Sequence, residues 1–163
     1  MIEAEEMPCP PGMEVRFRGL YRQMVAETVD RPDPPFAIVP LGDEDAAEML
    51  ALATLTVPGP FVERTHRIGA FFGVKQEGRL VAMAGERMRV DGFTEVSAVC
   101  SHPDHRGRGY AGALMREVAH RILARGEAAF LHVNAQNEGA IALYESLGFR
   151  IRASITGTVV ARV

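Results

Sequence analysis

The stretch from residue 93 to residue 133 limits the possible folds more than any other part of the sequence. It predicts a strand at residues 93–101, a helix at 109–126 and a buried strand at 128–133. The helix is predicted from one apolar face with i, i+3, i+4, i+7 and i+11 spacing, formed by Ala111, Leu114, Met115, Val118 and Ile122. A helical crossover joins parallel strands. We therefore expect the two strands to be parallel neighbours in a mixed sheet.

Strands and helices also alternate in the segments around this unit. Gln76-Glu77-Gly78 and Asp91-Gly92 are hairpin turn sequences, and Gly126 and Gly148 are positioned to end helices. The expected elements are strands at 36–41, 70–75, 79–90, 93–101, 128–133, 149–156 and 157–163, and helices at 43–56, 61–67, 109–126 and 137–147. The predicted class is therefore α/β, with an α+β type of mixed sheet and the order β-α-α-β-β-β-α-β-α-β-β.

The first 35 residues differ from the rest of the chain. Residues 1–11 are rich in glutamate and proline, which predicts a loose tail, and residues 13–30 predict an edge strand followed by a strand or short helix. We expect a tail and peripheral segment at residues 1–35 and one folded domain at residues 36–163.

The composition narrows the class of protein. With 163 residues, 47% hydrophobic and 24% charged, the chain suits one globular domain. A net charge of -3 argues against nucleic acid as a partner, and no apolar run approaches the roughly 18 residues of a membrane span. Two cysteines do not make a disulfide framework, and the N-terminus does not resemble a signal peptide. A cytoplasmic location is expected.

A glycine-rich segment joins the predicted strand at 93–101 to the following helix. Its sequence, at residues 105–112, is His-Arg-Gly-Arg-Gly-Tyr-Ala-Gly. Glycines allow close backbone approach to a ligand, and the free N–H groups and dipole of a helix N-terminus attract an anion. The segment therefore predicts a cradle for a diphosphate, although a plain glycine turn between strand and helix is the alternative.

Two sequence patterns in this order resemble the GNAT superfamily of acyl-CoA N-acyltransferases. Arg106, Gly109 and Ala111 match its Arg-x-x-Gly-x-Ala cofactor signature. Residues 137–149 match its Asn-x-x-Ala-x-x-Leu-Tyr-x-x-x-Gly-Phe pattern without departure, and the strand at 95–101 is similar to the one that precedes the loop in this family. The resemblance covers residues 36–163.

The resemblance implies a fold and an activity. The fold is a mixed sheet of about seven strands with about four flanking helices, in which two central parallel strands splay apart to admit the pantetheine arm of coenzyme A. The activity is transfer of an acetyl or other short acyl group from acyl-CoA to a primary amine by direct attack in a ternary complex, without a metal. The implied cofactor-binding residues are Val99, Cys100, Ser101, Arg106, Gly107, Arg108, Gly109, Tyr110, Ala111, Gly112 and Asn137.

Tyr144 is the candidate catalytic acid. The resemblance points its hydroxyl at the departing sulfur, where a proton donor assists the leaving thiolate. A core aromatic on an amphipathic helix is the alternative. Asn137 opens the same helix and could cap it, contact the cofactor or do both, and Asn134 is an alternative cofactor contact.

Glu95 is the candidate catalytic base. Strand alternation puts it on one face with Phe93, Ser97 and Val99, and a carboxylate acting directly or through water could take a proton from the bound ammonium. The alternative is a carboxylate that solvates an exposed sheet face. His132 is expected to be a satisfied, partly buried histidine rather than a base.

Rival readings and partners stay open at this point. Cys100, His102 and His105 could hold zinc, but a small buried cysteine is favoured. A non-catalytic acyl-CoA-binding regulatory module is the main alternative function. The expected acceptor is an amine-bearing small molecule, peptide or protein, whose carboxylate could meet Arg64 or Arg67. Exposed terminal strands, such as the one at 157–163, make a homodimer an expectation.

Overall fold

A single sheet organises the protein, whose computed structural model describes residues 8–30 and 33–163. Its seven strands follow the order β2-β3-β4-β5-β6-β1-β7. They are β1 (Met13–Ala26), β2 (Val39–Leu41), β3 (Phe71–Gln76), β4 (Arg79–Val90), β5 (Phe93–Ser101), β6 (Ala128–Asn134) and β7 (Arg150–Arg162). The helices are α1 (Ala46–Thr56), α2 (Tyr110–Ala124) and α3 (Glu138–Ser146), with 3-10 turns at Asp43–Asp45, Thr65–Arg67 and Pro103–His105.

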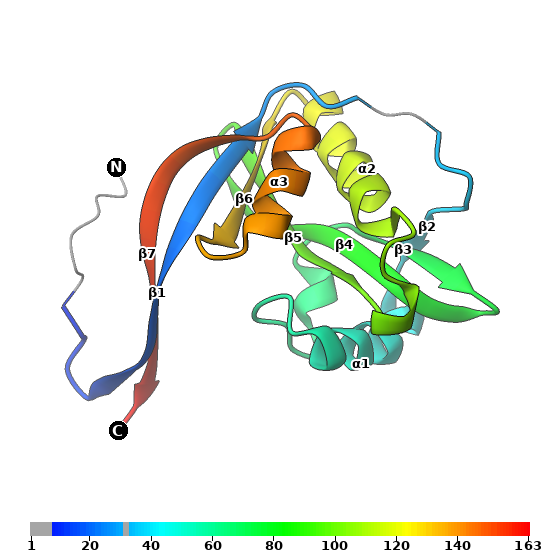
Figure 1. The fold of residues 1–163 in the computed structure, drawn as a ribbon. Helices are drawn as coiled ribbons and strands as arrows, with labels where there is room; N and C mark the ends of the chain where they lie inside the picture. The colour runs from blue at the N-terminus through cyan, green and yellow to red at the C-terminus, as the bar shows by residue number, and fades with distance from the viewer. Residues whose placement is uncertain (1–7, 31–32) are drawn as a thin grey trace.

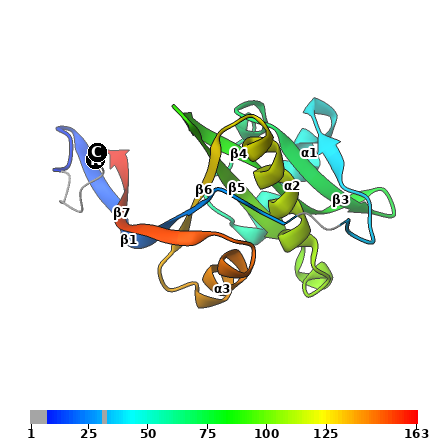
Figure 2. The ribbon, with the colours of Figure 1, turned by 90° about the horizontal axis from the view of Figure 1, so that it is seen from above.

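The helices lie on opposite faces of the sheet (Figure 1). The apolar face of α2, with Leu114, Met115 and Val118 fully buried, packs against β3 to β6, and α3 adds apolar side chains to the same core. On the other face α1 packs against β4 and β5 around Met49 and Phe71. Figures 1 and 2 show that α1 lies well away from β1 and β7. Among the described residues, no helix therefore covers the α1 face of β6, β1 and β7 (Figures 1 and 2).

The crossover unit agrees with the sequence prediction. β5 and β6 are parallel neighbours joined by α2, and the expected hairpins β3–β4 and β4–β5 are present. The expected sheet of about seven mixed strands is confirmed. The short helix expected at residues 61–67 is reduced to the 3-10 turn Thr65–Arg67, so the described residues contain three α-helices rather than about four.

The N-terminal segment is an inner strand of the sheet. β1 pairs antiparallel with β6 on one side and with β7 on the other. Residues 13–26 are therefore part of the sheet, whereas the sequence placed them in a peripheral segment. The predicted tail at residues 1–11 falls mostly outside the described residues, and residues 8–11 are exposed.

The C-terminal residues form one long strand rather than the expected pair. Gly157, which was expected to separate two strands, lies opposite Gly19 inside the β1–β7 pairing. A Cβ at Gly157 would lie 2.6 Å from a ring carbon of Tyr21, so this glycine makes room for a neighbouring side chain and does not mark a turn. The distal halves of β1 and β7 extend from the body as a two-stranded ribbon (Figures 1 and 2).

No helix in the described ranges is long and apolar enough to cross a bilayer.

Candidate functional site

The predicted phosphate loop lines a cleft at the N-terminus of α2. The cleft encloses about 330 Å³ and is bounded by the loop at residues 105–112 together with Ser101, Leu143 and Leu147. Gly107 and Gly109 have φ angles of +74° and +80°, which favour glycine. The first N–H groups of α2 have no intrahelical acceptor, and among the described residues no side chain caps them. These N–H groups are free to bind an anion.

Arg116 is a further cationic side chain in this cleft that the sequence analysis missed. It lies one turn after Gly112 on α2 and lines the same cavity as Arg106 and Arg108. Its Nε–H is buried and has no partner in the described part of the chain. An anion in the cleft would supply that partner. The i+4 spacing from Gly112 is the signal that could have found it.

A second cleft begins where β5 separates from β6. The two strands are paired at Phe93, Thr94 and Glu95, and the pairing stops there. Beyond this point a cleft of about 130 Å³ lies between the strands, bounded by Ser97, Ala98 and Val99 of β5, His132 of β6, Tyr144 of α3 and the Pro58–Pro60 loop. Residues 96–99 of β5 thus line this cleft and Ser101 lines the first one, while the other edge of β5 pairs with β4. This is the splayed geometry that the sequence resemblance implied.

A bulge in β5 sets which side chains face which side of the sheet. Ala98 has a φ angle of +52°, and the β4–β5 register shifts between the pairs Met83–Cys100 and Gly85–Ser97. Val96 and Val99 consequently pack on the α2 side, while Ala98 and Cys100 pack on the α1 side. The prediction that Val99 shares a face with Glu95 is therefore wrong, because the bulge reverses the alternation.

Tyr144 lines the second cleft and is half-buried. Its hydroxyl makes no hydrogen bond to any residue that the structure describes, and its ring lies 6.5 Å from that of Phe149. Burial raises the pKa of Tyr144 above its ordinary value, so the hydroxyl keeps its proton at neutral pH. A protonated hydroxyl without a partner is suited to donate to an incoming group.

The two asparagines have structural partners. Asn137 is the N-cap of α3, and its side-chain oxygen accepts a hydrogen bond from the Ala140 N–H at 3.1 Å. Asn134 accepts one from the Gln136 N–H at 2.9 Å. The cap predicted for Asn137 is confirmed, and its contact with a cofactor stays a prediction.

Glu95 lies at the start of the splay in a buried hydrogen-bond network. Its side chain is 1% exposed, and Arg87 donates to both carboxylate oxygens at 2.8 Å. His132 Nδ1 lies 2.8 Å from Glu95 Oε1. Burial raises the pKa of Glu95, but the hydrogen bonds from His132 and Arg87 and the charge of Arg87 lower it more, so the net pKa lies below its ordinary value. The carboxylate is therefore charged, and both of its oxygens accept hydrogen bonds from Arg87 or His132.

The network continues to β1 and β7, and its ends fix the direction of every hydrogen bond. Arg152 donates to the Gln23 side-chain oxygen, so the Gln23 amide nitrogen faces His132 Nε2 at 3.1 Å. An amide nitrogen donates, so His132 Nε2 accepts, and its Nδ1–H donates to Glu95. His132 is therefore held as the neutral Nδ1–H tautomer, in agreement with the satisfied, partly buried histidine expected from the sequence.

In the described part of the chain, the residues considered as zinc ligands do not come together, and the arginines considered as contacts for a substrate carboxylate line neither of the two clefts. Cys100 is buried in the α1 core, and burial raises the pKa of its thiol to about 11. Cys100, His102 and His105 do not assemble, and the described residues contain no group of three or more His, Cys, Asp or Glu side chains that could hold a metal. Arg67 is paired with Asp43 at 2.8 Å, and Arg64 lines a separate surface hollow with Phe61.

Comparison with known proteins identifies the family. The model of the family described as FR47-like protein matches residues 71–156. A solved structure of a GNAT-family protein from Novosphingobium aromaticivorans is 48% identical, with a TM-score of 0.93, over 99% of this chain and 72% of that chain. The chain belongs to the GNAT family.

Two further similar proteins are bacterial acetyltransferases. The crystal structure of the ribosomal-protein-S18-alanine N-acetyltransferase from Escherichia coli has a TM-score of 0.63 and 28% identity over 72% of this GNAT chain and 79% of that chain. N-alpha-acetyltransferase RimI from Mycobacterium tuberculosis is 37% identical over 83 residues, which is 49% of this chain and 51% of that protein. The chain thus spans about half the length of the curated relatives it matches.

Proposed function

We propose that this GNAT protein is an acyl-CoA-dependent N-acyltransferase that moves an acetyl or other short acyl group to a primary amine. The observation that supports this most directly is the pair of clefts along β5. One cleft holds the phosphate loop and the other holds Tyr144, and β5 borders both through Ser101 and Val99. The regulatory-module alternative would not require a protonated, unpartnered tyrosine hydroxyl in the second cleft.

We propose that the co-substrate is acetyl-CoA or another acyl-CoA, which binds along these clefts. In the proposal, the N–H groups of residues 106–112 hold the pyrophosphate, and Arg116 adds a charge-assisted hydrogen bond. The edge of β5 from Val99 to Ser101, including the backbone of Cys100, offers hydrogen bonds to the pantetheine arm. The acyl group then lies beside Tyr144.

The chemistry is direct attack on the thioester. The amine nitrogen forms a bond to the acyl carbon, and the carbon–sulfur bond breaks. The Tyr144 hydroxyl gives its proton to the departing thiolate, and the proton that the nitrogen loses as the amide forms returns to the Tyr144 oxygen. Tyr144 is proposed as the acid because it lines the cleft, and because burial raises its pKa so that the hydroxyl keeps its proton at neutral pH.

Proton removal from the ammonium is proposed to use Glu95 through His132. Glu95 is buried and paired, so direct protonation would break its contacts with Arg87. His132 lines the cleft, and its Nε2 is the accepting atom. The amine would replace the Gln23 amide at Nε2, His132 would take the proton, and Glu95 would stabilise the imidazolium. This role for Glu95 replaces the one expected from the sequence, in which the carboxylate takes the proton directly or through water, and it gives His132 a role as base that the sequence analysis did not expect.

The first test is release of free thiol from acetyl-CoA across a panel of amines, amino acids and peptides. Loss of a general acid lowers turnover by about a hundredfold or more, so Tyr144→Phe is expected to reduce kcat with little change in coenzyme A binding. Tyr21→Phe is the matched control, because Tyr21 lines the same cleft from β1. Coenzyme A binding without thiol release from any amine would favour the regulatory-module alternative.

The acceptor, the cellular location and the oligomeric state complete the proposal. The relatives named above include an enzyme that acts on an alanine of a ribosomal protein, which supports an amine-bearing acceptor for this chain as well. A cytoplasmic location and a homodimer through the exposed ribbon stay predictions. Val15, Phe17 and Val159, which are exposed on that ribbon, give the dimer its apolar surface.

A further inference from the structure

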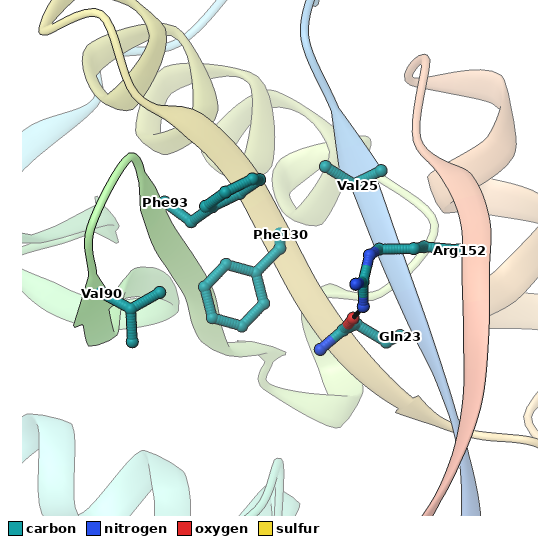
Figure 3. A pocket seen from close by; sticks show the side chains of 6 residues that line it. All are labelled: Gln23, Val25, Val90, Phe93, Phe130 and Arg152. Atoms are coloured by element: carbon teal, nitrogen blue, oxygen red, sulfur yellow. Dashed lines mark hydrogen bonds between the residues drawn. The ribbon is translucent and has the colours of Figure 1, made fainter. Parts of the chain in front are cut away.

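A third pocket opens on the uncovered face of the sheet, on the side away from α2. Figure 3 shows Phe93, Phe130 and Val90 grouped on one side, with Val25, Gln23 and Arg152 on the other. The pocket encloses about 180 Å³. Met24 and Leu131, the chain neighbours of these residues, are buried on the α2 side, so strand alternation places Gln23, Val25 and Phe130 on the opposite face.

The pocket adjoins the cleft of Tyr144, because two of the residues that line the pocket contact His132 of the cleft. Gln23 lines the pocket and contacts His132, which lines the cleft. The rings of Phe130 and His132 are in edge contact, with centroids 5.6 Å apart. A molecule whose amine reaches His132 therefore has its adjacent groups in this pocket.

The lining determines what those groups should be. Four of the pocket residues are apolar, and two of them are phenylalanines, so an aromatic or branched aliphatic group is favoured. An apolar cavity of about 150 Å³ holds a benzene ring, whereas whole drug-sized ligands need about 300–1,000 Å³. The pocket therefore suits one side chain.

Arg152 adds a positive charge with unused donors. It donates to Gln23, and it has no carboxylate within ion-pair distance in the described part of the chain. The carboxylate of Glu27 is occupied by Arg150 at 2.8 Å, and that of Glu95 by Arg87. A guanidinium in this state binds a carboxylate by two parallel hydrogen bonds.

We propose that this pocket, bounded by Phe93, Phe130 and Arg152, binds the acceptor, and that the acceptor is an α-amino acid with a large apolar side chain. The side chain lies between the phenylalanines, the carboxylate lies on Arg152, and the amine faces His132. The assignment rests on the proposed acyl transfer, because it names the acceptor of that same site.

The test compares L-phenylalanine, L-phenylalaninamide and L-alanine as acceptors in the thiol-release assay. L-phenylalanine is expected to give the highest kcat/KM. Loss of hydrogen bonds to a charged group weakens binding by about tenfold to a hundredfold, so Arg152→Gln is expected to raise KM for L-phenylalanine by that factor and to leave KM for the amide unchanged. Arg150→Gln, two positions earlier on β7, is the matched control.

A second variant probes the apolar part of the pocket. Val90 is 57% exposed at the rim, so Val90→Phe can fill the pocket without entering the core. It is expected to remove the preference for L-phenylalanine over L-alanine. Equal turnover of these two acceptors by the native protein, or better turnover of the amide than of the acid, would overturn the proposal.

Failure of the acyl transfer itself is separated by a binding measurement. Calorimetry with L-phenylalanine and the coenzyme A-bound protein needs no turnover. Binding that Arg152→Gln weakens, in a protein without transferase activity, would support the pocket and refute the proposed function. Absence of L-phenylalanine binding would overturn the pocket assignment.

Discussion

Replacement of Arg87 by methionine tests the buried ion pair at the base of the splay. The change keeps most of the side-chain volume and removes the two hydrogen bonds from Arg87 to Glu95, whose side chain is 1% exposed. Breaking a buried pair from one side costs about 3–5 kcal/mol. Because Arg87 itself is 27% exposed, we expect the lower end, about 3 kcal/mol. For a chain of this size that corresponds to a Tm lower by about 6–12 °C.

The loss of stability in Arg87→Met should depend on pH. In the native protein the pKa of Glu95 lies below its ordinary value of 4.5, so its stabilisation is fully present above that pH and is lost as the pH falls through the folded-state pKa. Without Arg87, burial is left opposed only by His132, and the pKa of Glu95 should rise. The variant then gains stability relative to the native protein as the pH falls, so the difference in Tm should narrow from pH 7.5 to pH 4.

Thermal unfolding across this pH range measures the effect, with two further variants. Arg87→Met/Glu95→Gln should be more stable than Arg87→Met, because the uncompensated charge is gone. Arg150→Met removes an exposed pair with Glu27 and should change stability by less than about 1 kcal/mol. A small, pH-independent loss of stability in Arg87→Met, with no recovery of stability in the double variant, would show that Arg87 does not compensate the buried charge of Glu95.

Three further predictions concern other parts of the molecule. In Gly85→Ala the new Cβ would lie 2.4 Å from the buried ring of Phe71, and such overpacking should cost about 1–3 kcal/mol in urea unfolding; a stability equal to the native protein would contradict the packing. At pH 8 a thiol reagent should modify the exposed Cys9 rapidly and Cys100, whose pKa is raised to about 11, only on unfolding; fast reaction of both thiols would show that Cys100 is accessible. Hydrogen bonds from Thr94, and then from arginines, lower the pKa of Glu127 to about 2, so the NMR chemical shift of its carboxyl group should remain that of the charged form down to pH 3. The stability that this carboxylate contributes should be lost only as the pH falls from 4.5 through the folded-state pKa of about 2. Titration of Glu127 near pH 4.5 would contradict these contacts.

The sequence predicted the parts of the structure that depend on neighbouring residues. The loop and α2 follow from glycine spacing and a 3.6-residue period, and both are decided within a few turns of chain. The parallel pairing of β5 and β6 follows from the crossover length. For the same reason Tyr144 was located on its helix from a local pattern.

The parts that were missed depend on distant contacts. A strand was expected at the start of residues 13–30, but as an edge strand. The inner position of β1 depends on its pairing with β6 and β7, which lie more than a hundred positions later. In the sequence, Gly157 looks like a turn residue. The reason for a glycine at this position is the close approach of the Tyr21 ring, which the sequence does not show. The network from Arg87 to Arg152 brings together residues of five strands. It also needs a second register shift in the β4–β5 pairing, between Glu86 and Arg89, and no pattern along the sequence predicts these contacts.

The inner position of β1 affects how the chain assembles. β1 precedes the other strands of the sheet in the sequence, yet Ser154, the partner of Arg22 in β7, lies 132 positions later. The pairing of β1 with β7 therefore has to wait for the last strand and contributes to a high contact order. At the far end of the ribbon the Val163 N–H donates to the Gly12 carbonyl at 3.2 Å. A circular permutant that links these two residues by a short turn and opens between β1 and β2 would convert the most distant pairing of the sheet into a hairpin, and we expect it to refold faster with the same sheet order.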